Sequence, residues 1–267
     1  MIGLAAHTLF SDPVDAAEFA DGWRAFNQGN YEDARLFWEP LAKAGDARAQ
    51  YNLGVMYDRG QGVAPDPGRA MGLWRAAAAQ DLLWAQHNLG LALVSGTGGE
   101  PDHVAGSKWL TKASDAGFAP SQYALGQLYM RGLGVDNDPV RAVKLYRLAA
   151  DQGVSEAQYE LGRTYREGVG DDIEADATRA SNWFKLAADQ GNPAAQNSLG
   201  RQYVRGSGVE RDDVEALKWL VLSAGQDHPE AKKNEQRLKQ RMTVEQIRES
   251  EKRIALWREE RDPGDTP

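Results

Sequence analysis

The stretch that determines the fold is AQYNLGVMYDRGQGV, residues 49–63. Its Leu-Gly pair recurs at steps of 36, 36, 36 and 38 residues, as Leu53-Gly54, Leu89-Gly90, Leu125-Gly126, Leu161-Gly162 and Leu199-Gly200. A glutamine lies three residues before each leucine: Gln50, Gln86, Gln122, Gln158 and Gln196. Glycines follow seven and nine residues after each leucine, and an aspartate follows them. Columns that stay in phase over five copies indicate an array of repeats of one supersecondary unit.

Each repeat is predicted to be a pair of helices. Ala49, Leu53 and Tyr57 are spaced as one face of a helix, which we call helix A. The glycine in its middle costs about 1 kcal/mol relative to alanine, which implies that a partner helix packs closely there. The Gly-x-Gly ends helix A, since glycine adopts positive φ without a steric clash. The aspartate then caps a second helix, helix B.

Helix B is expected to supply large residues to the core. Four residues after each aspartate comes a small residue, followed by a pair of large ones. Small residues facing large ones predict interdigitated packing. The tryptophans that recur in this helix are therefore expected in the core: Trp38, Trp74, Trp109, Trp183 and Trp219. The fourth repeat is two residues longer, and we place the insertion in its loop, Val169 to Asp176, where a solenoid tolerates added residues.

The repeat pattern divides the chain into four segments. Residues 1–13 are a flexible N-terminus or the remnant of a signal peptide, and residues 45–226 are the five repeats. Residues 14–44 form an N-terminal helix pair resembling a tetratricopeptide unit, with helices over 14–28 and 31–44. Residues 227–267 are capping helices and a tail, because a solenoid needs a polar cap over its last core face.

The helices at both ends have predicted core residues. We expect Phe19, Trp23 and Phe26 of the first helix to face inward. In the last helix, Thr243 and Gln246 have the spacing of a capping box. Its apolar stripe is Val244, Ile247, Ile254 and Trp257.

Composition and charge limit the function classes. The chain has 31 Lys plus Arg against 39 Asp plus Glu, a net charge of -8, which argues against nucleic acid as the main partner. It has no cysteine, so disulfides and thiolate chemistry are excluded. No apolar run has the roughly 18 residues of a membrane helix, so no transmembrane insertion is expected.

The N-terminus leaves localisation open. Residues 1–10 are mostly apolar but lack the positive region of a signal peptide, and Val14-Asp15-Ala16 has the compact residues that a signal peptidase recognises. One interpretation is a frayed tail. The other is the end of a signal peptide that starts upstream, which would place the protein in a bacterial periplasm or outside the cell rather than in the cytoplasm.

The unit over residues 49–63 resembles a Sel-one-like repeat, a relative of the tetratricopeptide repeat. The resemblance is specific over residues 45–226 and weaker over 14–44. It implies an all-α fold: a right-handed α/α superhelical solenoid, here with about six helix-turn-helix repeats and a C-terminal capping helix. It also implies a bacterial adaptor that binds other proteins. One branch of the family carries a disulfide in each repeat, and this chain, without cysteine, departs from it.

Candidate binding residues lie on helix A, outside its core stripe. If the tetratricopeptide alignment holds, they face a concave groove that is aromatic and apolar in its first half and arginine-rich in its second. The predicted partner-binding residues are Tyr51, His87, Tyr123, Tyr159, Arg163, Arg166, Arg201 and Arg205. Aromatic and arginine side chains contribute most of the energy of protein interfaces. The alternative is that these arginines pair with nearby acids such as Glu156, Glu160 and Glu167.

The leading hypothesis is a non-catalytic scaffold that holds a protein or peptide segment, with an acidic end, in this groove. The four histidines fall in different repeats and no clustered catalytic set is found, so we expect no catalytic residue, cofactor or metal. A glycan or peptidoglycan binder, with Tyr51, Tyr123 and Tyr159 stacking on sugars, is the alternative. A hydrolase, as suggested for cysteine-rich relatives, is a further one. The oligomeric state and the identity of the partner stay open.

Overall fold

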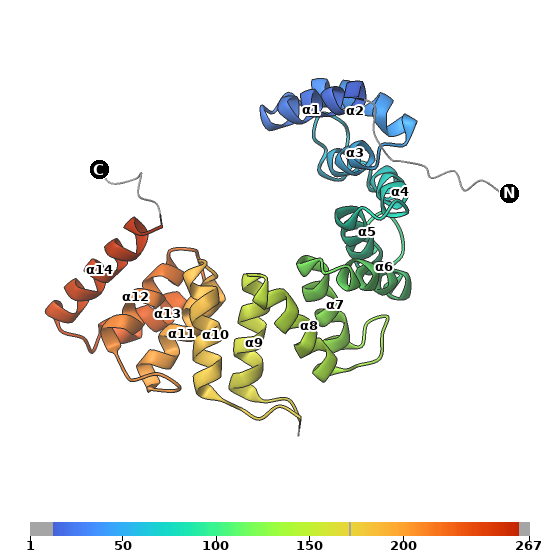
Figure 1. Cartoon of the computed structure of the whole chain (residues 1–267). Coiled ribbons are helices and arrows are strands. Elements are labelled where there is room, and N and C mark those ends of the chain that lie inside the picture. Colours follow the sequence, from blue (N-terminus) through green and yellow to red (C-terminus); the bar gives the residue numbers. More distant parts are fainter. Residues whose placement is uncertain (1–12, 171, 262–267) are drawn as a thin grey trace. The chain divides into compact units, whose positions relative to one another are not determined.

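The computed structural model describes residues 13–170 and 172–261, which form α-helices joined by short loops (Figure 1). Within these ranges there is no β-strand, and an isolated β-bridge joins Val169 to Ile173. The all-α prediction is confirmed. The expected flexible or signal-derived segment, residues 1–13, lies outside the described residues except for Pro13, which begins the first helix. The described residues fall into two compact units.

The first unit contains residues 13–121 and 133–135. Its helices are α1 (Pro13–Asn27), α2 (Tyr31–Ala44), α3 (Ala47–Arg59), α4 (Pro67–Ala78), α5 (Leu83–Ser95) and α6 (His103–Asp115). They pack as consecutive pairs, α1 on α2, α3 on α4 and α5 on α6, and each pair also contacts the next. The predicted helices over 14–28 and 31–44 correspond to α1 and α2 within one residue.

The second unit contains residues 122–132 and the described residues from 136 to 261. Its helices are α7 (Ala119–Arg131, whose first three residues belong to the first unit), α8 (Pro139–Asp151), α9 (Ser155–Glu167), α10 (Ala177–Asp189), α11 (Pro193–Arg205), α12 (Asp213–Ala224), α13 (Pro229–Lys239) and α14 (Val244–Glu259). Helix α9 packs on α10 and α11 on α12, and both α13 and α14 pack on α12. Six helix pairs followed by capping helices agree with the predicted organisation.

The glycine in the middle of each helix A is the point of closest approach to helix B. A Cβ atom placed on Gly126 would lie 2.7 Å from Cε1 of Tyr146, and one on Gly162 would lie 2.5 Å from Cδ1 of Phe184. The corresponding glycines of the other repeats meet the same position of helix B: Trp74, Leu110 and Leu220. The predicted packing role of this glycine is therefore confirmed, because any side chain would displace a buried large residue.

The aspartate column caps helix B as expected. The side chains of Asp66, Asp102, Asp138, Asp176 and Asp212 each accept a hydrogen bond from a backbone N–H in the first turn of their helix. Asn30, which occupies the same column before α2, makes no such bond. An N-cap of this kind typically contributes about 1 kcal/mol, so α2 begins without a stabilisation that the later B helices share.

The second glycine of each Gly-x-Gly packs on the preceding repeat. Gly134 has φ +71, a conformation that favours glycine, and a Cβ there would overlap the carbonyl of His103 at the start of α6. Gly62, Gly98 and Gly208 lie in the same way against the first turns of α2, α4 and α10. Gly170 is the exception, with nothing within 4 Å of a Cβ placed on it. The loop of this longer repeat is instead joined by backbone hydrogen bonds between Val169 and Ile173.

The expected aromatic core needs correction at three tryptophans. Trp23 is 47% exposed, although its ring lies 6.5 Å from that of Trp38, because Gly22 and Ala25 hold the buried positions of α1. Trp109 and Trp183 are only half-buried, since the second member of each large pair, Leu110 or Phe184, occupies the fully buried position. Trp38, Trp74 and Trp219 are buried as predicted.

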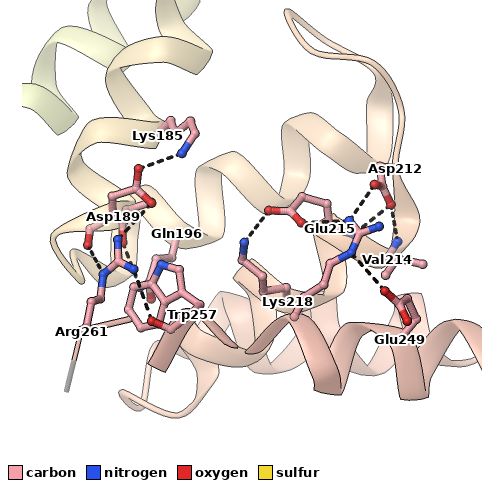
Figure 2. Close-up of polar contacts among 12 residues, drawn as sticks. Lys185, Asp189, Gln196, Asp212, Val214, Glu215, Lys218, Glu249, Trp257 and Arg261 are labelled. Atoms are coloured by element: carbon pink, nitrogen blue, oxygen red, sulfur yellow. Dashed lines mark hydrogen bonds and ion pairs between the residues drawn. The ribbon is translucent and has the colours of Figure 1, made fainter. Parts of the chain in front are cut away.

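The capping helix α14 is held on α12 by ion pairs around a small apolar contact (Figure 2). Arg253 lies 2.9 Å from Asp212, the N-cap of α12, and 3.0 Å from Glu215 of α12. Arg261, just after α14, lies 3.3 Å from Asp189 at the end of α10. Ile254 is buried and Trp257 meets the ring of Trp219 edge-on, 6.0 Å between centroids. The predicted capping box of Thr243 and Gln246 is present. Val244, predicted in the apolar stripe, is instead 59% exposed, because it lies in the first turn beyond the contact with α12.

Candidate functional site

The predicted partner-binding residues all lie on A helices, two in the first unit and six in the second. Tyr51 is on α3 and His87 on α5; Tyr123 is on α7, Tyr159, Arg163 and Arg166 are on α9, and Arg201 and Arg205 are on α11. Each unit therefore carries its own candidate surface.

In the first unit, Tyr51 is a half-buried residue beside an open pocket. Burial raises the pKa of its hydroxyl, which hydrogen-bonds the side chain of Asn88 on α5. The pocket, of about 260 Å³, is lined by Asn88 and Leu91 of α5, by Asp58 of α3 and by Trp74 of α4. Leu91 is 42% exposed, and Asn88 and Ser95 of the same helix add polar groups to this surface.

His87 is part of the packing between successive A helices. Its ring meets Phe118 edge-on, 5.6 Å between centroids, and its Nδ1 lies 3.0 Å from Oγ of Ser121. Burial lowers the pKa of His87 to about 4, so the ring is neutral at physiological pH. A ligand would meet only the exposed part of this residue.

In the second unit, the two candidate tyrosines pack against helix B. Tyr123 contacts Tyr146, and Tyr159 contacts Phe184, with 5.8 Å between ring centroids in both pairs. The hydroxyl of Tyr123 accepts a hydrogen bond from Gln127. Burial, reinforced by the charges of Glu160 and Glu156, raises the pKa of Tyr123 to about 12. Both rings are half-buried, so only part of each is available to a ligand.

The four candidate arginines divide into two kinds. Arg163 lies 3.3 Å from Glu160 and 3.9 Å from Glu167, and Arg166 also pairs with Glu167. Pairing of the arginines with nearby acids was the alternative left open by the sequence, and it occurs here with Glu160 and Glu167. Such exposed pairs each contribute only about 0–1 kcal/mol and can exchange for a ligand's carboxylate.

The other two arginines are unpaired and lie near Arg166. Among the described residues, neither Arg201 nor Arg205 makes an ion pair. Burial, together with the positive charges of Arg205 and Arg166, lowers the pKa of Arg201 from its ordinary value. The structure thus brings Arg166, Arg201 and Arg205 into one basic cluster. The positive charge of Arg163 instead lies near Tyr146 of α8, where it opposes the rise in the pKa of Tyr146 that burial causes.

The structure adds basic residues that sequence reasoning assigned to the polar cap. An open pocket next to Arg201 and Arg205 is also lined by Arg237 and Arg241, at the end of α13. The signal in the sequence was the spacing of four residues between these two arginines, the same as between Arg201 and Arg205. The many charged residues near the C-terminus make this spacing hard to recognise in the sequence.

A ladder of buried glutamines is a second feature that the sequence only partly revealed. Gln50, Gln86, Gln158 and Gln196 each donate to a carbonyl near the end of the preceding helix B, at 3.1–3.2 Å. The side-chain carbonyl oxygens of three of them accept from a second glutamine at the end of helix B of the same repeat, in the pairs Gln80–Gln50, Gln190–Gln158 and Gln226–Gln196. Ala116 takes the place of this donor in the second repeat, and Oε1 of Gln86 is left without a partner. These residues join repeats and do not form a ligand site.

The described residues contain neither a group of metal ligands nor a helix that could span a membrane. Within residues 13–170 and 172–261, no three His, Asp or Glu side chains are grouped closely enough to hold a metal ion. In the same part of the chain, every helix is too short or too polar to cross a bilayer.

Consecutive helix pairs with a repeated glycine crossing define an α/α repeat protein, and comparison with known proteins identifies the kind. The Sel1 repeat profile matches residues 47–82, 85–118, 119–154, 155–192 and 193–228. A Sel1 repeat protein from Oxalobacter formigenes is 31% identical, with a TM-score of 0.80 over 91% of this chain and 99% of that one. The chain therefore belongs to the Sel1 repeat family.

A more distant structure has the same fold. The immunity protein PA5088 from Pseudomonas aeruginosa is 19% identical, with a TM-score of 0.53 over 84% of this chain and 90% of that one. At this identity the likeness extends to the fold alone. A search of curated proteins finds no match. Sel1 repeat proteins are generally non-catalytic scaffolds for protein–protein interactions.

Proposed function

We propose that this protein is a non-catalytic adaptor that binds a partner segment carrying acidic residues along the A helices of its second unit. The observation that supports this is the basic cluster of Arg166, Arg201 and Arg205, which lies on neighbouring A helices of a chain whose net charge is -8. Like charges placed together in this way repel one another, and an anionic ligand relieves that repulsion. Guanidinium groups bind carboxylates in bidentate geometry, which favours an acidic peptide.

The tyrosines support a peptide over a glycan. Sugar recognition by stacking needs an exposed ring face, and the rings of Tyr123 and Tyr159 pack on Tyr146 and Phe184. Their half-buried position suits contact with an apolar side chain that flanks the acidic residues. Tyr51 and His87, in the first unit, belong to a separate and more apolar surface, which would contact another part of the same partner.

The test is a selection from a random dodecapeptide library on the folded protein. The wild type should enrich peptides with Asp or Glu next to an apolar residue. The double variant Arg163→Glu, Arg166→Glu should lose this enrichment, because it reverses charge on the exposed side of α9. A matched control, Lys144→Glu with Arg147→Glu, reverses two charges on the exposed face of helix B in the same unit and should enrich the same peptides as wild type.

Salt dependence gives a second measurement on the selected peptides. Exposed charge pairs are screened within about 8 Å at physiological ionic strength, so binding should weaken steadily as salt is added. Enrichment without acidic residues, or equal binding by the wild type and the α9 variant at low and high salt, would reject the proposal.

A further inference from the structure

An open pocket of about 200 Å³ lies between α11, α12 and α13. Its rim carries four arginines, Arg201 and Arg205 from α11 and Arg237 and Arg241 from the end of α13. Four arginines around one small opening make this surface strongly basic. It adjoins the basic cluster through Arg201 and Arg205, which belong to both.

Three of these arginines have no ion-pair partner among the described residues. Arg201, Arg205 and Arg237 make no ion pair with any described residue, and Arg241 alone is paired, 3.3 Å from Asp213. Glu230 is near enough to favour the charged form of Arg201, but its carboxylate binds Lys233 at 2.9 Å. Elsewhere in this unit, most arginines of the A and B helices are paired with acids. The pocket therefore has positive charge to offer a ligand.

Apolar side chains of the core form part of the pocket lining. Val204, Leu220 and Leu238 line it, and both leucines are almost fully buried in the core beneath. Asn234 also lines the pocket, and its amide nitrogen donates to Oδ1 of Asn197 at 2.9 Å. This bond leaves the carbonyl oxygen of Asn234 as an acceptor for a backbone N–H.

We infer that this pocket binds the C-terminal carboxylate of a partner chain whose last residue is apolar, a proposal that rests on the proposed function. A basic rim around an apolar interior calls for an anion and an apolar group joined by very few bonds. At an apolar C-terminal residue, the carboxylate and the side chain are attached to the same Cα. An Asp or Glu side chain supplies the carboxylate without the adjacent apolar group. The acidic segment on α9 and α11 would then lead to an end anchored between α11 and α13.

The experiment uses the full chain, labelled with ¹⁵N, and follows the Nε–Hε signals of its arginines by NMR. The probes are acetyl-Ser-Gly-Ser-Gly-Leu with a free carboxylate, the same peptide as its C-terminal amide, and acetyl-Ser-Gly-Glu-Gly-Ser-amide, whose only carboxylate is a side chain. The free-carboxylate peptide should shift the signals of Arg201, Arg205 and Arg237. The other two probes should bind at least about tenfold more weakly, because each lacks either the terminal carboxylate or the apolar group.

Variants test the pocket residues one at a time. Arg205→Gln and Arg237→Gln should each weaken binding of the free-carboxylate peptide by about tenfold, as expected for removing a charged hydrogen-bond partner. The matched control is Arg248→Gln, at an exposed position of α14 away from the pocket, which removes the same charge and should bind like wild type. Thermal melts followed by circular dichroism establish that all three variants are folded.

Two results would overturn the inference. One is equal binding of the free-carboxylate and amidated peptides; the other is unchanged binding by Arg237→Gln. Failure of the proposed function, binding of an acidic segment along the A helices, can be distinguished from these results, because it is measured on the dodecapeptide library with the α9 variant. Acidic enrichment that is the same for wild type and the α9 variant, with the free-carboxylate peptide still bound here, would reject the groove and keep the pocket.

Discussion

The second repeat, α5 with α6, and the fifth, α11 with α12, use the same internal design for different surfaces. In both, a mid-helix glycine meets a buried leucine of helix B, Leu110 or Leu220. In both, a buried glutamine donates to the end of the previous helix B, Gln86 to Ala78 and Gln196 to Ala188. The residues that pack one repeat on the next are therefore nearly interchangeable.

Two other helix A columns of the same repeats differ completely. Leu91 of α5, 42% exposed, occupies the position of Arg201 on α11. His87 of α5 contacts Ser121, whereas Asn197, at the equivalent position of α11, is bonded to Asn234 of α13. Because these columns lie outside the glycine, leucine and glutamine columns that define the repeat, they can change while the fold is kept. The comparison teaches that binding specificity is encoded in positions that the repeat pattern does not constrain.

The largest expected effect is on the shared glycine. Gly126→Leu should lower the free energy of unfolding by about 3 kcal/mol, the upper end of the usual cost of overpacking, because its Cβ would lie 2.7 Å from Cε1 of Tyr146. Urea denaturation measures the change. The control is Gly72→Leu, on an exposed part of α4 with nothing within 4 Å, which should be neutral or stabilising. Equal stability of Gly126→Leu and wild type would show that the helix crossing does not need glycine.

A smaller effect is expected on the pH dependence of stability, which should arise from His87 in the second repeat but not from Asn197 at the equivalent position of the fifth. The pKa of His87 is lowered to about 4 in the folded protein, below the value of 6.5 expected when unfolded. The unfolded state then binds the extra proton first, so stability is complete above about pH 6.5 and falls as the pH drops toward 4. After allowance for partial exposure, the loss should be about 2 kcal/mol.

The measurement for His87 is urea denaturation of wild type and His87→Gln at pH 7 and pH 4.5. Glutamine does not titrate, so the variant should lose less stability between the two pH values than wild type does. If the two proteins lose the same amount, His87 is not the group responsible.

The smallest effect concerns the glutamine ladder, which is interrupted in the second repeat. Ala116→Gln should supply the missing donor to Oε1 of Gln86 and stabilise the protein by about 1 kcal/mol. Gln190→Ala removes the equivalent donor to Gln158 in the second unit and should destabilise by a similar amount. Thermal melts of both variants give the comparison, and changes of the same sign would contradict the ladder.

Much of the fold could be predicted because its determinants are local and repeated. The glycine column, the capping aspartates and the bounds of α1 and α2 all follow from spacing within a single helix pair. The burial predicted for Trp23 was wrong because residue type was given more weight than position: the small residues Gly22 and Ala25 hold the buried positions of α1, while Trp23 contacts Trp38 and stays 47% exposed.

The candidate site was harder to predict because its contacts join different repeats. The packing of His87 on Phe118 links residues 31 positions apart, which no helical periodicity reveals. The donor column of the glutamine ladder was missed because Ala116 breaks its pattern. Arg237 and Arg241 became candidates only when α13 was seen to pack beside α11 around a common pocket.

The loop of the fourth repeat has a practical consequence for engineering. Its Gly170 has no neighbour, and the turn is closed by hydrogen bonds between Val169 and Ile173, without the contact that the other repeats make with the preceding helix B. Added residues there lengthen a turn that already closes on itself. An epitope or a small fluorescent domain inserted after Gly170 would therefore report on the protein in its native complexes while the helices on either side, and the arginines beyond them, remain as they are.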